Sequence, residues 1–201
     1  MTPDTSETSS GLKDSSSESE ALKDSVASRL TGEIRHERFP IVGIGASAGG
    51  LEAFEQFFAA MPADSGMAFV LIQHLDPKRK SILSELLGRK TPMPVEEAED
   101  HMLVEPNHVY TIPPNRNMAI KDLRLLLFPM TGPYVQHTPI DFFLQSLAEA
   151  HTADAIGIVL SGSGSEGVAG LRAIKGEGGI TLAQKPETAS YDSMPTSSIR
   201  A

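Results

Sequence analysis

The sequence contains no cysteine and no tryptophan, and aromatic residues occupy only 5% of its 201 positions. The absence of cysteine excludes disulfide bonds, thiolate nucleophiles and cysteine-ligated metals. Acidic residues outnumber lysine and arginine by 26 to 17, and the resulting formal net charge of −9 disfavours nucleic acid as the main partner. No apolar run approaches the roughly 18 residues of a membrane helix, and the N-terminus lacks the apolar segment of a secretory signal. These features agree with a cytoplasmic location.

Two parts of the chain differ in composition. Residues 1–38 are polar and acidic, and such a segment cannot bury enough apolar surface to offset its ordering entropy, so we expect a disordered tail or linker. Residues 39–201 alternate between apolar runs and helix-compatible segments. This pattern predicts one doubly wound α/β domain with a mainly parallel sheet and helices on both faces. Short apolar segments at 107–112, 118–120 and 124–128 predict a small antiparallel hairpin region within it.

A strand, a glycine-rich turn and a helix are predicted around residues 39–50, which read FPIVGIGASAGG. The turn permits three interpretations. Residues 45–49 fit the G-x-S-x-G nucleophile elbow, in which a serine is exposed at the end of a strand. Residues 43–48 fit the G-x-G-x-x-A dinucleotide fingerprint. The third interpretation is a glycine-rich turn that only packs a helix on a sheet.

Three polar side chains follow predicted buried strands. Ser47, His74 and Glu166 each lie in the turn after an apolar run. Because ligands bind outside the carboxyl ends of parallel strands, we expect these residues to meet at one edge of the sheet. Taken singly, each has an ordinary structural explanation, as a turn cap, a structural histidine and a solvated carboxylate.

These three residue types are the ones that a hydrolytic triad requires. A serine hydroxyl needs a base, imidazole is a suitable base at neutral pH, and a carboxylate orients the imidazole and stabilises its charged form. The N–H of Ala48, at a helix N-terminus, would face the developing oxyanion. A dinucleotide site expects an acidic residue near the end of the second strand, where this chain has Gln73 and His74. The other histidines lie in separate segments without ligand spacing, so we expect no metal and no cofactor.

The three turns resemble those of CheB-type protein-glutamate methylesterases of bacterial chemotaxis. The similarity is carried by GASAGG at 45–50, Gln73-His74 and LSGSGSEG at 160–167, with further likeness at 136–141, 178–184 and Ser193-Met194-Pro195. The resemblance implies a serine hydrolase that demethylates glutamate γ-methyl esters on chemoreceptor helices, releases methanol and also deamidates receptor glutamines. The implied partners are methylated chemoreceptor helices and a receptor methyltransferase, on the same or another chain.

The resemblance also assigns roles to individual residues. Ser47 is similar to the nucleophile, His74 to the general base, and Glu166 to the third triad member. The backbone N–H groups of Ala48 and Ser163 correspond to the oxyanion donors. Lys78 and Arg79 follow His74 closely; they are either part of a solvated loop or contact acidic residues that flank the receptor ester.

Three departures from the family pattern define an alternative. The family's aspartate is Glu166 here, one methylene longer. Many relatives carry an N-terminal receiver domain, whereas this chain has a polar tail, so we expect no regulation by a phosphorylated aspartate on the same chain. The overall pattern resembles the esterase part of esterase–methyltransferase fusions. The chain also stops earlier than expected, so we expect residues 39–201 to be a catalytic domain truncated at its C-terminus. A catalytically impaired regulatory or scaffold module is therefore the alternative to an active esterase, and a dinucleotide-binding domain is a more distant one.

Overall fold

A six-stranded parallel sheet forms the centre of the fold. The computed structural model describes residues 38–73, 83–130 and 138–201. The chain divides into two units, Met1–Glu37 and Arg38–Ala201, and the described residues all belong to the second, so the predicted polar tail lies outside them apart from Arg38. The strand order is β3-β5-β2-β1-β8-β9. The strands are β1 (Ile41–Ala46), β2 (Ala68–Gln73), β3 (Val95–Glu97), β5 (Val109–Thr111), β8 (Ala155–Val159) and β9 (Ile180–Ala183).

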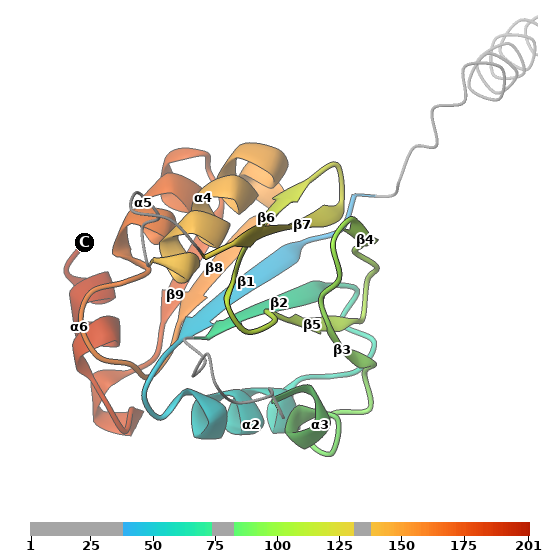
Figure 1. Cartoon of the computed structure of the whole chain (residues 1–201). Coiled ribbons are helices and arrows are strands. Elements are labelled where there is room, and N and C mark those ends of the chain that lie inside the picture. Colours follow the sequence, from blue (N-terminus) through green and yellow to red (C-terminus); the bar gives the residue numbers. More distant parts are fainter. Residues whose placement is uncertain (1–37, 74–82, 131–137) are drawn as a thin grey trace, which may run out of the picture. The chain divides into compact units, whose positions relative to one another are not determined.

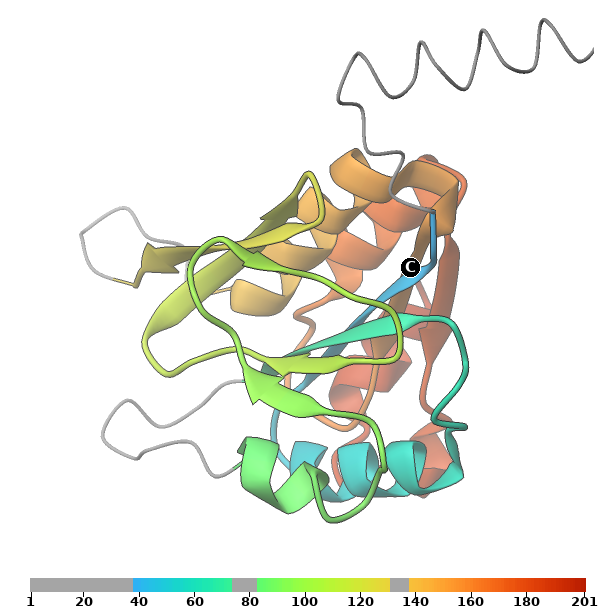
Figure 2. The ribbon, with the colours of Figure 1, turned by 90° about the vertical axis from the view of Figure 1, so that its right-hand side faces the viewer.

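Helices cover both faces of this sheet, which confirms the predicted α/β architecture (Figures 1 and 2). The helices are α2 (Gly50–Ala60), α3 (Leu83–Leu87), α4 (Pro139–His151), α5 (Val168–Gly176) and α6 (Ser193–Ile199), with short 3₁₀ turns η1 (Thr152–Asp154) and η2 (Pro186–Thr188). Side chains alternate along a strand, so Ile41 of β1 packs in the cluster with α4 and α5, while Val42 and Ile44 pack in the cluster with α2 and α3. Burial on both faces explains why the central strands are continuous apolar runs in the sequence.

The glycines inside β1 allow α4 to approach the sheet closely. A Cβ atom on Gly43 would lie 2.7 Å from Cδ2 of Leu144, and one on Gly45 would overlap Cγ2 of Ile140. Both glycines lie on the face of β1 that α4 covers. They therefore have a packing role, which accounts for the first part of the glycine pattern without a bound nucleotide.

A second, three-stranded antiparallel sheet has the order β4-β7-β6 and contains β4 (Met102–Leu103), β6 (Arg116–Lys121) and β7 (Arg124–Pro129). The predicted hairpin is confirmed for β6 and β7, whose tight turn places Asp122 and Leu123 at φ angles of 49° and 59°. The prediction was wrong for segment 107–112. Its strand, β5, pairs in parallel with β2 and β3 and belongs to the main sheet, because its three residues are buried as a parallel interior strand requires.

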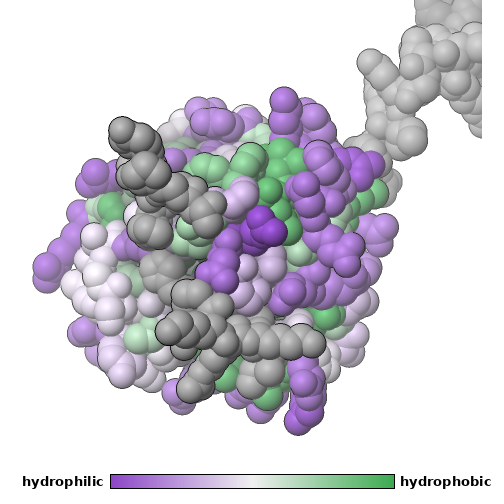
Figure 3. Space-filling model, in the orientation of Figure 1, coloured by the Kyte–Doolittle hydropathy of each residue, from purple (hydrophilic) through white to green (hydrophobic). Residues whose placement is uncertain are grey.

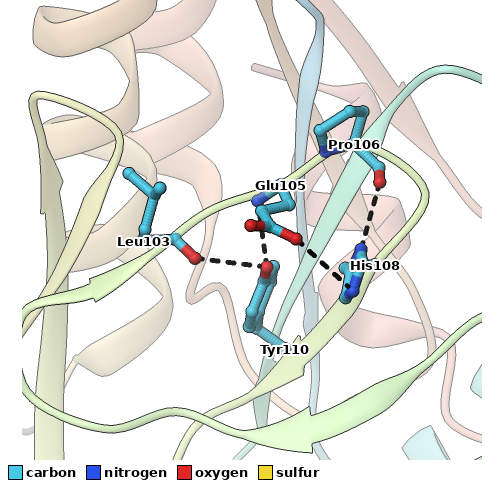
Figure 4. Close-up of polar contacts among 5 residues, drawn as sticks. All are labelled: Leu103, Glu105, Pro106, His108 and Tyr110. Carbon is cyan, nitrogen blue, oxygen red and sulfur yellow. Dashed lines mark hydrogen bonds and ion pairs between the residues drawn. The ribbon is translucent and has the colours of Figure 1, made fainter.

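The Tyr110 hydroxyl stabilises the loop that leads from β4 to β5 (Figure 4). It accepts a hydrogen bond of 2.9 Å from the N–H of Glu105 and donates one of 3.3 Å to the carbonyl of Leu103. The ring of His108 stacks on Tyr110 at a centroid distance of 6.1 Å, and His108 Nε2 lies 3.8 Å from a carboxylate oxygen of Glu105. Burial raises the pKa of the Tyr110 phenol. His108 directly precedes β5, so this network begins at the amino end of that strand, whereas the candidate site lies at the carboxyl ends of the parallel strands.

The surface carries a small hydrophobic group over β6 and β7 (Figure 3). Phe128 of β7 and Phe142 of α4 are partly exposed and contact each other edge to face, with ring centroids 5.8 Å apart. Among the described helices, none has the length and apolar character needed to cross a membrane.

Candidate active site

The order in which strands join the sheet changes direction at β1. β2 pairs with one edge of β1 and β8 with the other, so the carboxyl end of β1 is a topological switch point, where open α/β sheets bind ligands. Ser47 follows β1 directly, and Glu166 lies in the turn after β8, so these predicted site turns are neighbours. His74 is the residue after the end of β2 and lies outside the described residues. Lys78 and Arg79 also lie outside them.

Hydrogen bonds hold the peptide groups around Ser47. Its N–H donates to the carbonyl of Ser161 at 3.0 Å, and its own carbonyl accepts the N–H of Gly50 at 2.9 Å. The side-chain amide of Gln73 reaches the same carbonyl at 3.4 Å. The Ala48 N–H, in contrast, has no hydrogen-bond acceptor among the described residues. The turn therefore holds a half-buried serine rigidly and leaves the next N–H available at the start of α2.

Gly49 is required by the shape of this turn. It precedes α2 with a φ of 71°, in the left-handed region that favours glycine. A Cβ atom there would also lie 2.7 Å from Oγ of Ser161 and 2.9 Å from Cβ of Ser190. The glycine therefore lets the Ser47 turn approach the chain segments that follow β8 and β9.

Ser163 presents a second N–H group without a described acceptor. The N–H of Gly162 donates to the carbonyl of Tyr191 at 3.0 Å, and that of Gly164 donates to Oγ of Ser193 at 3.1 Å. The Ser163 N–H between them makes no such bond within the described parts of the chain, and Ser163 is exposed. Each of the two turns therefore has one backbone N–H, that of Ala48 or that of Ser163, without an acceptor among the described residues.

The Glu166 carboxylate binds the N-terminus of α4. Its Oε1 accepts the N–H of Ile140 at 2.7 Å. Thr138 occupies the N-cap position of α4, but its side chain makes no capping hydrogen bond. The capping acceptor comes instead from Glu166, in a turn distant in the sequence, and a carboxylate there also interacts favourably with the helix dipole. Because Ile140 packs on Gly45, the same helix turn connects Glu166 to the end of β1.

Ser161 is a site residue that the sequence analysis did not identify. It is buried, and its hydroxyl donates to the carbonyl of Ala48 at 2.9 Å and accepts the N–H of Tyr191 at 3.0 Å. The only sequence signal was its position directly after an apolar run, at the first residue of a Ser- and Gly-rich turn. Four serines and glycines follow it, so the pattern alone does not separate a buried hydroxyl from a solvated one.

Within residues 38–73, 83–130 and 138–201, no group of three or more histidine and acidic residues is arranged to hold a metal ion. The chemistry that these residues offer is a serine hydroxyl, a carboxylate and two backbone N–H groups without a described acceptor. Such a set suits acyl transfer, in which charge develops on a carbonyl oxygen.

Comparison with known proteins gives consistent matches. The family model described as CheB methylesterase matches residues 42–201. The protein-glutamate methylesterase/protein-glutamine glutaminase of Mesorhizobium japonicum is 33% identical over 156 residues, covering 77% of this chain and 46% of the relative. A putative protein of the same name from Leptospira interrogans is 30% identical over 165 residues, covering 81% of this chain and 85% of the relative.

A solved structure matches at the level of the fold. The Thermotoga maritima CheB methylesterase catalytic domain superposes with a TM-score of 0.73 at 28% sequence identity, covering 81% of this chain and 88% of that domain. The chain thus spans about half the length of the Mesorhizobium relative and most of an isolated catalytic domain.

Proposed function

Because the chain belongs to the CheB methylesterase family, we propose that it is a serine hydrolase that demethylates glutamate γ-methyl esters on chemoreceptors. The products are methanol and the free receptor glutamate. Relatives named protein-glutamate methylesterase/protein-glutamine glutaminase support this activity and a second one, the deamidation of receptor glutamines. The observation that carries the proposal is the pair of adjacent turns at the switch point, with Ser47 on one and Glu166 on the other.

The reaction would proceed through an acyl-enzyme. Ser47 Oγ attacks the ester carbonyl carbon while His74 accepts the hydroxyl proton, and the N–H groups of Ala48 and Ser163 stabilise the oxyanion. The tetrahedral intermediate collapses, and the C–O bond to the methoxy group breaks as His74 returns the proton, releasing methanol. Water, deprotonated by His74, then attacks the acyl carbonyl carbon. The bond from that carbon to Ser47 Oγ breaks, His74 returns the proton to Oγ, and the receptor glutamate is released. Glu166 would stabilise the imidazolium that forms in each half-reaction.

Glutamine deamidation would follow the same steps with a different leaving group. Attack on the side-chain amide gives the same acyl-enzyme, and ammonia leaves instead of methanol after taking the proton from His74.

The proposal includes substrate contacts, in which Lys78 and Arg79 bind acidic residues beside the ester. It also includes a cytoplasmic location and a receptor methyltransferase as a functional partner.

The second candidate is a catalytically impaired regulatory module. The Glu166 carboxylate, whose Oε1 accepts the N–H of Ile140, would then act as a cap for α4 and not in catalysis.

The test is methanol release from a methylated chemoreceptor fragment, with Ser47→Ala as the control. We expect release by the wild-type chain, loss of release in the variant, and labelling of Ser47 by a fluorophosphonate. A folded wild-type chain that neither releases methanol nor reacts with the probe would contradict the hydrolase and favour the regulatory module.

A further inference from the structure

We propose that Ser161 is a positioning residue for the proposed hydrolase, and that its hydroxyl holds both oxyanion donors in place. Ser161 is the residue that follows Leu160 after β8, and it is only 1% exposed. The inference rests on the proposed function, because an oxyanion develops only in that hydrolytic reaction. The Ser161 side chain itself would not contact the substrate.

Two hydrogen bonds connect Ser161 to the nucleophile turn. Its carbonyl accepts the N–H of Ser47 at 3.0 Å, and its hydroxyl donates to the carbonyl of Ala48 at 2.9 Å. These bonds fix the peptide group before Ser47 and the one after Ala48. The peptide group between them carries the Ala48 N–H, so its direction is determined from both sides.

The same hydroxyl connects Ser161 to the segment after β9. It accepts the N–H of Tyr191 at 3.0 Å, while the carbonyl of Tyr191 accepts the N–H of Gly162 at 3.0 Å. The Ser161 N–H donates to Oε1 of Gln184 at 2.8 Å. Since the Gly164 N–H is held by Ser193, the chain is fixed on both sides of the second oxyanion donor, the N–H of Ser163.

A single buried hydroxyl thus couples three segments that are far apart in the sequence. Oxyanion stabilisation depends on donors that are already oriented before the charge develops, and a displacement of about 1 Å can cost on the order of a hundredfold in rate. Removing the hydroxyl leaves the carbonyl of Ala48 and the N–H of Tyr191 without this partner. We therefore expect a loss in the chemical step, with substrate binding largely preserved.

The experiment compares Ser161→Ala and Ser161→Thr with a matched control, Thr91→Ala. Thr91 is also a buried residue, 6% exposed, and its hydroxyl accepts the N–H of Met93 at 3.2 Å. It precedes β3, at the opposite edge of the sheet from β9. Each protein is assayed for kcat and KM of methanol release, for the rate of fluorophosphonate labelling of Ser47, and for its urea midpoint.

We expect Ser161→Ala to lower kcat and the labelling rate about ten- to a hundredfold with little change in KM. Threonine retains the hydroxyl, so Ser161→Thr should recover most of both rates. Thr91→Ala should lower the urea midpoint while leaving kcat and labelling unchanged. Wild-type rates in Ser161→Ala, or an equal loss of kcat in Thr91→Ala, would overturn the positioning role.

The two proposals fail in different ways. If the wild-type chain is labelled by the fluorophosphonate but releases no methanol, the receptor-ester substrate is wrong, and the labelling rates of the variants still decide the role of Ser161. If Ser47 of the folded wild-type chain is not labelled at all, both the hydrolase and the positioning role are contradicted.

Discussion

At the scale of single residues, Glu166 has two roles that can be separated. Its carboxylate caps α4 through the N–H of Ile140, and in the proposed mechanism its charge stabilises the imidazolium of His74. Glu166→Gln keeps an oxygen acceptor for the cap but removes the charge. We expect the variant to keep its unfolding free energy within about 0.5 kcal/mol and to lose about 10²–10⁴-fold in kcat for methanol release.

The contrasting substitution is Glu166→Ala, which removes the cap as well. Loss of a helix cap typically costs about 1 kcal/mol, so this variant should have a lower urea midpoint than Glu166→Gln at a similarly low kcat. If Glu166→Gln retains wild-type kcat, the carboxylate has only its structural role. Glutamate would then not replace the family's aspartate in the triad.

The individual site residues were predictable to different degrees. The positions of Ser47 and Glu166 at one edge of the sheet could be predicted because each follows an apolar run that is recognisable as a buried strand, and parallel strand ends gather at one edge. The capping role of Glu166 could not be found, because Thr138 and Pro139 form a sufficient local N-terminal signal. The competing acceptor comes from a turn 26 residues away, whose proximity exists only in the folded chain.

At the scale of elements, the packing of α4 on β1 depends on the glycines of the strand. A Cβ on Gly45 would overlap Ile140, so we expect Gly45→Ala to lower the unfolding free energy by about 1–3 kcal/mol in urea denaturation. Gly176→Ala is the matched control. Gly176 is the last residue of α5, and an added Cβ would have no atom within 4 Å, so this substitution should leave the unfolding free energy unchanged or raise it. In combination with Ile140→Ala, the cost of Gly45→Ala should fall, since the overlapping atoms are gone.

Additive costs of Gly45→Ala and Ile140→Ala in that double variant would show that the strain lies elsewhere in β1.

The elements themselves were predictable where they are long and strongly patterned, as in β1, β2 and α4. β5 was assigned to the wrong sheet because a run of three buried residues carries no periodicity that separates parallel from antiparallel pairing. β4, with two residues, is too short for any pattern.

At the scale of the whole molecule, the folded state brings together three segments that are distant in the sequence, the turn after β1, the turn after β8 and the segment around Tyr191. The sequence predicted that turns after β1 and β8 would meet there, because topology alone requires it. It did not predict that the Ser161 hydroxyl would join the Ser47 turn to Tyr191. From the sequence, a hydroxyl in a Ser- and Gly-rich turn is expected to be exposed to solvent. Residue type and spacing therefore could not predict the hydrogen bonds that the buried Ser161 hydroxyl makes.

Acid sensitivity is a property of the whole molecule to which His151 contributes. His151 ends α4 and is partly buried; burial lowers its pKa, Asp154 acts in the opposite direction, and Arg38 lowers it further. The folded state therefore favours the neutral imidazole. Below about pH 6.5 the unfolded chain binds the proton more readily, so the stability contribution of His151 is present above that pH and is lost as the pH falls.

His151→Gln removes this titration and retains a polar side chain at the end of α4. We expect the urea midpoint of the wild-type chain to fall more steeply than that of the variant between about pH 7.5 and pH 5. Carboxylate protonation contributes equally to both proteins, so the difference between the two slopes isolates His151. Equal slopes would mean that the imidazole gains its proton as easily in the folded chain as in the unfolded one, which would contradict its desolvation at the end of α4.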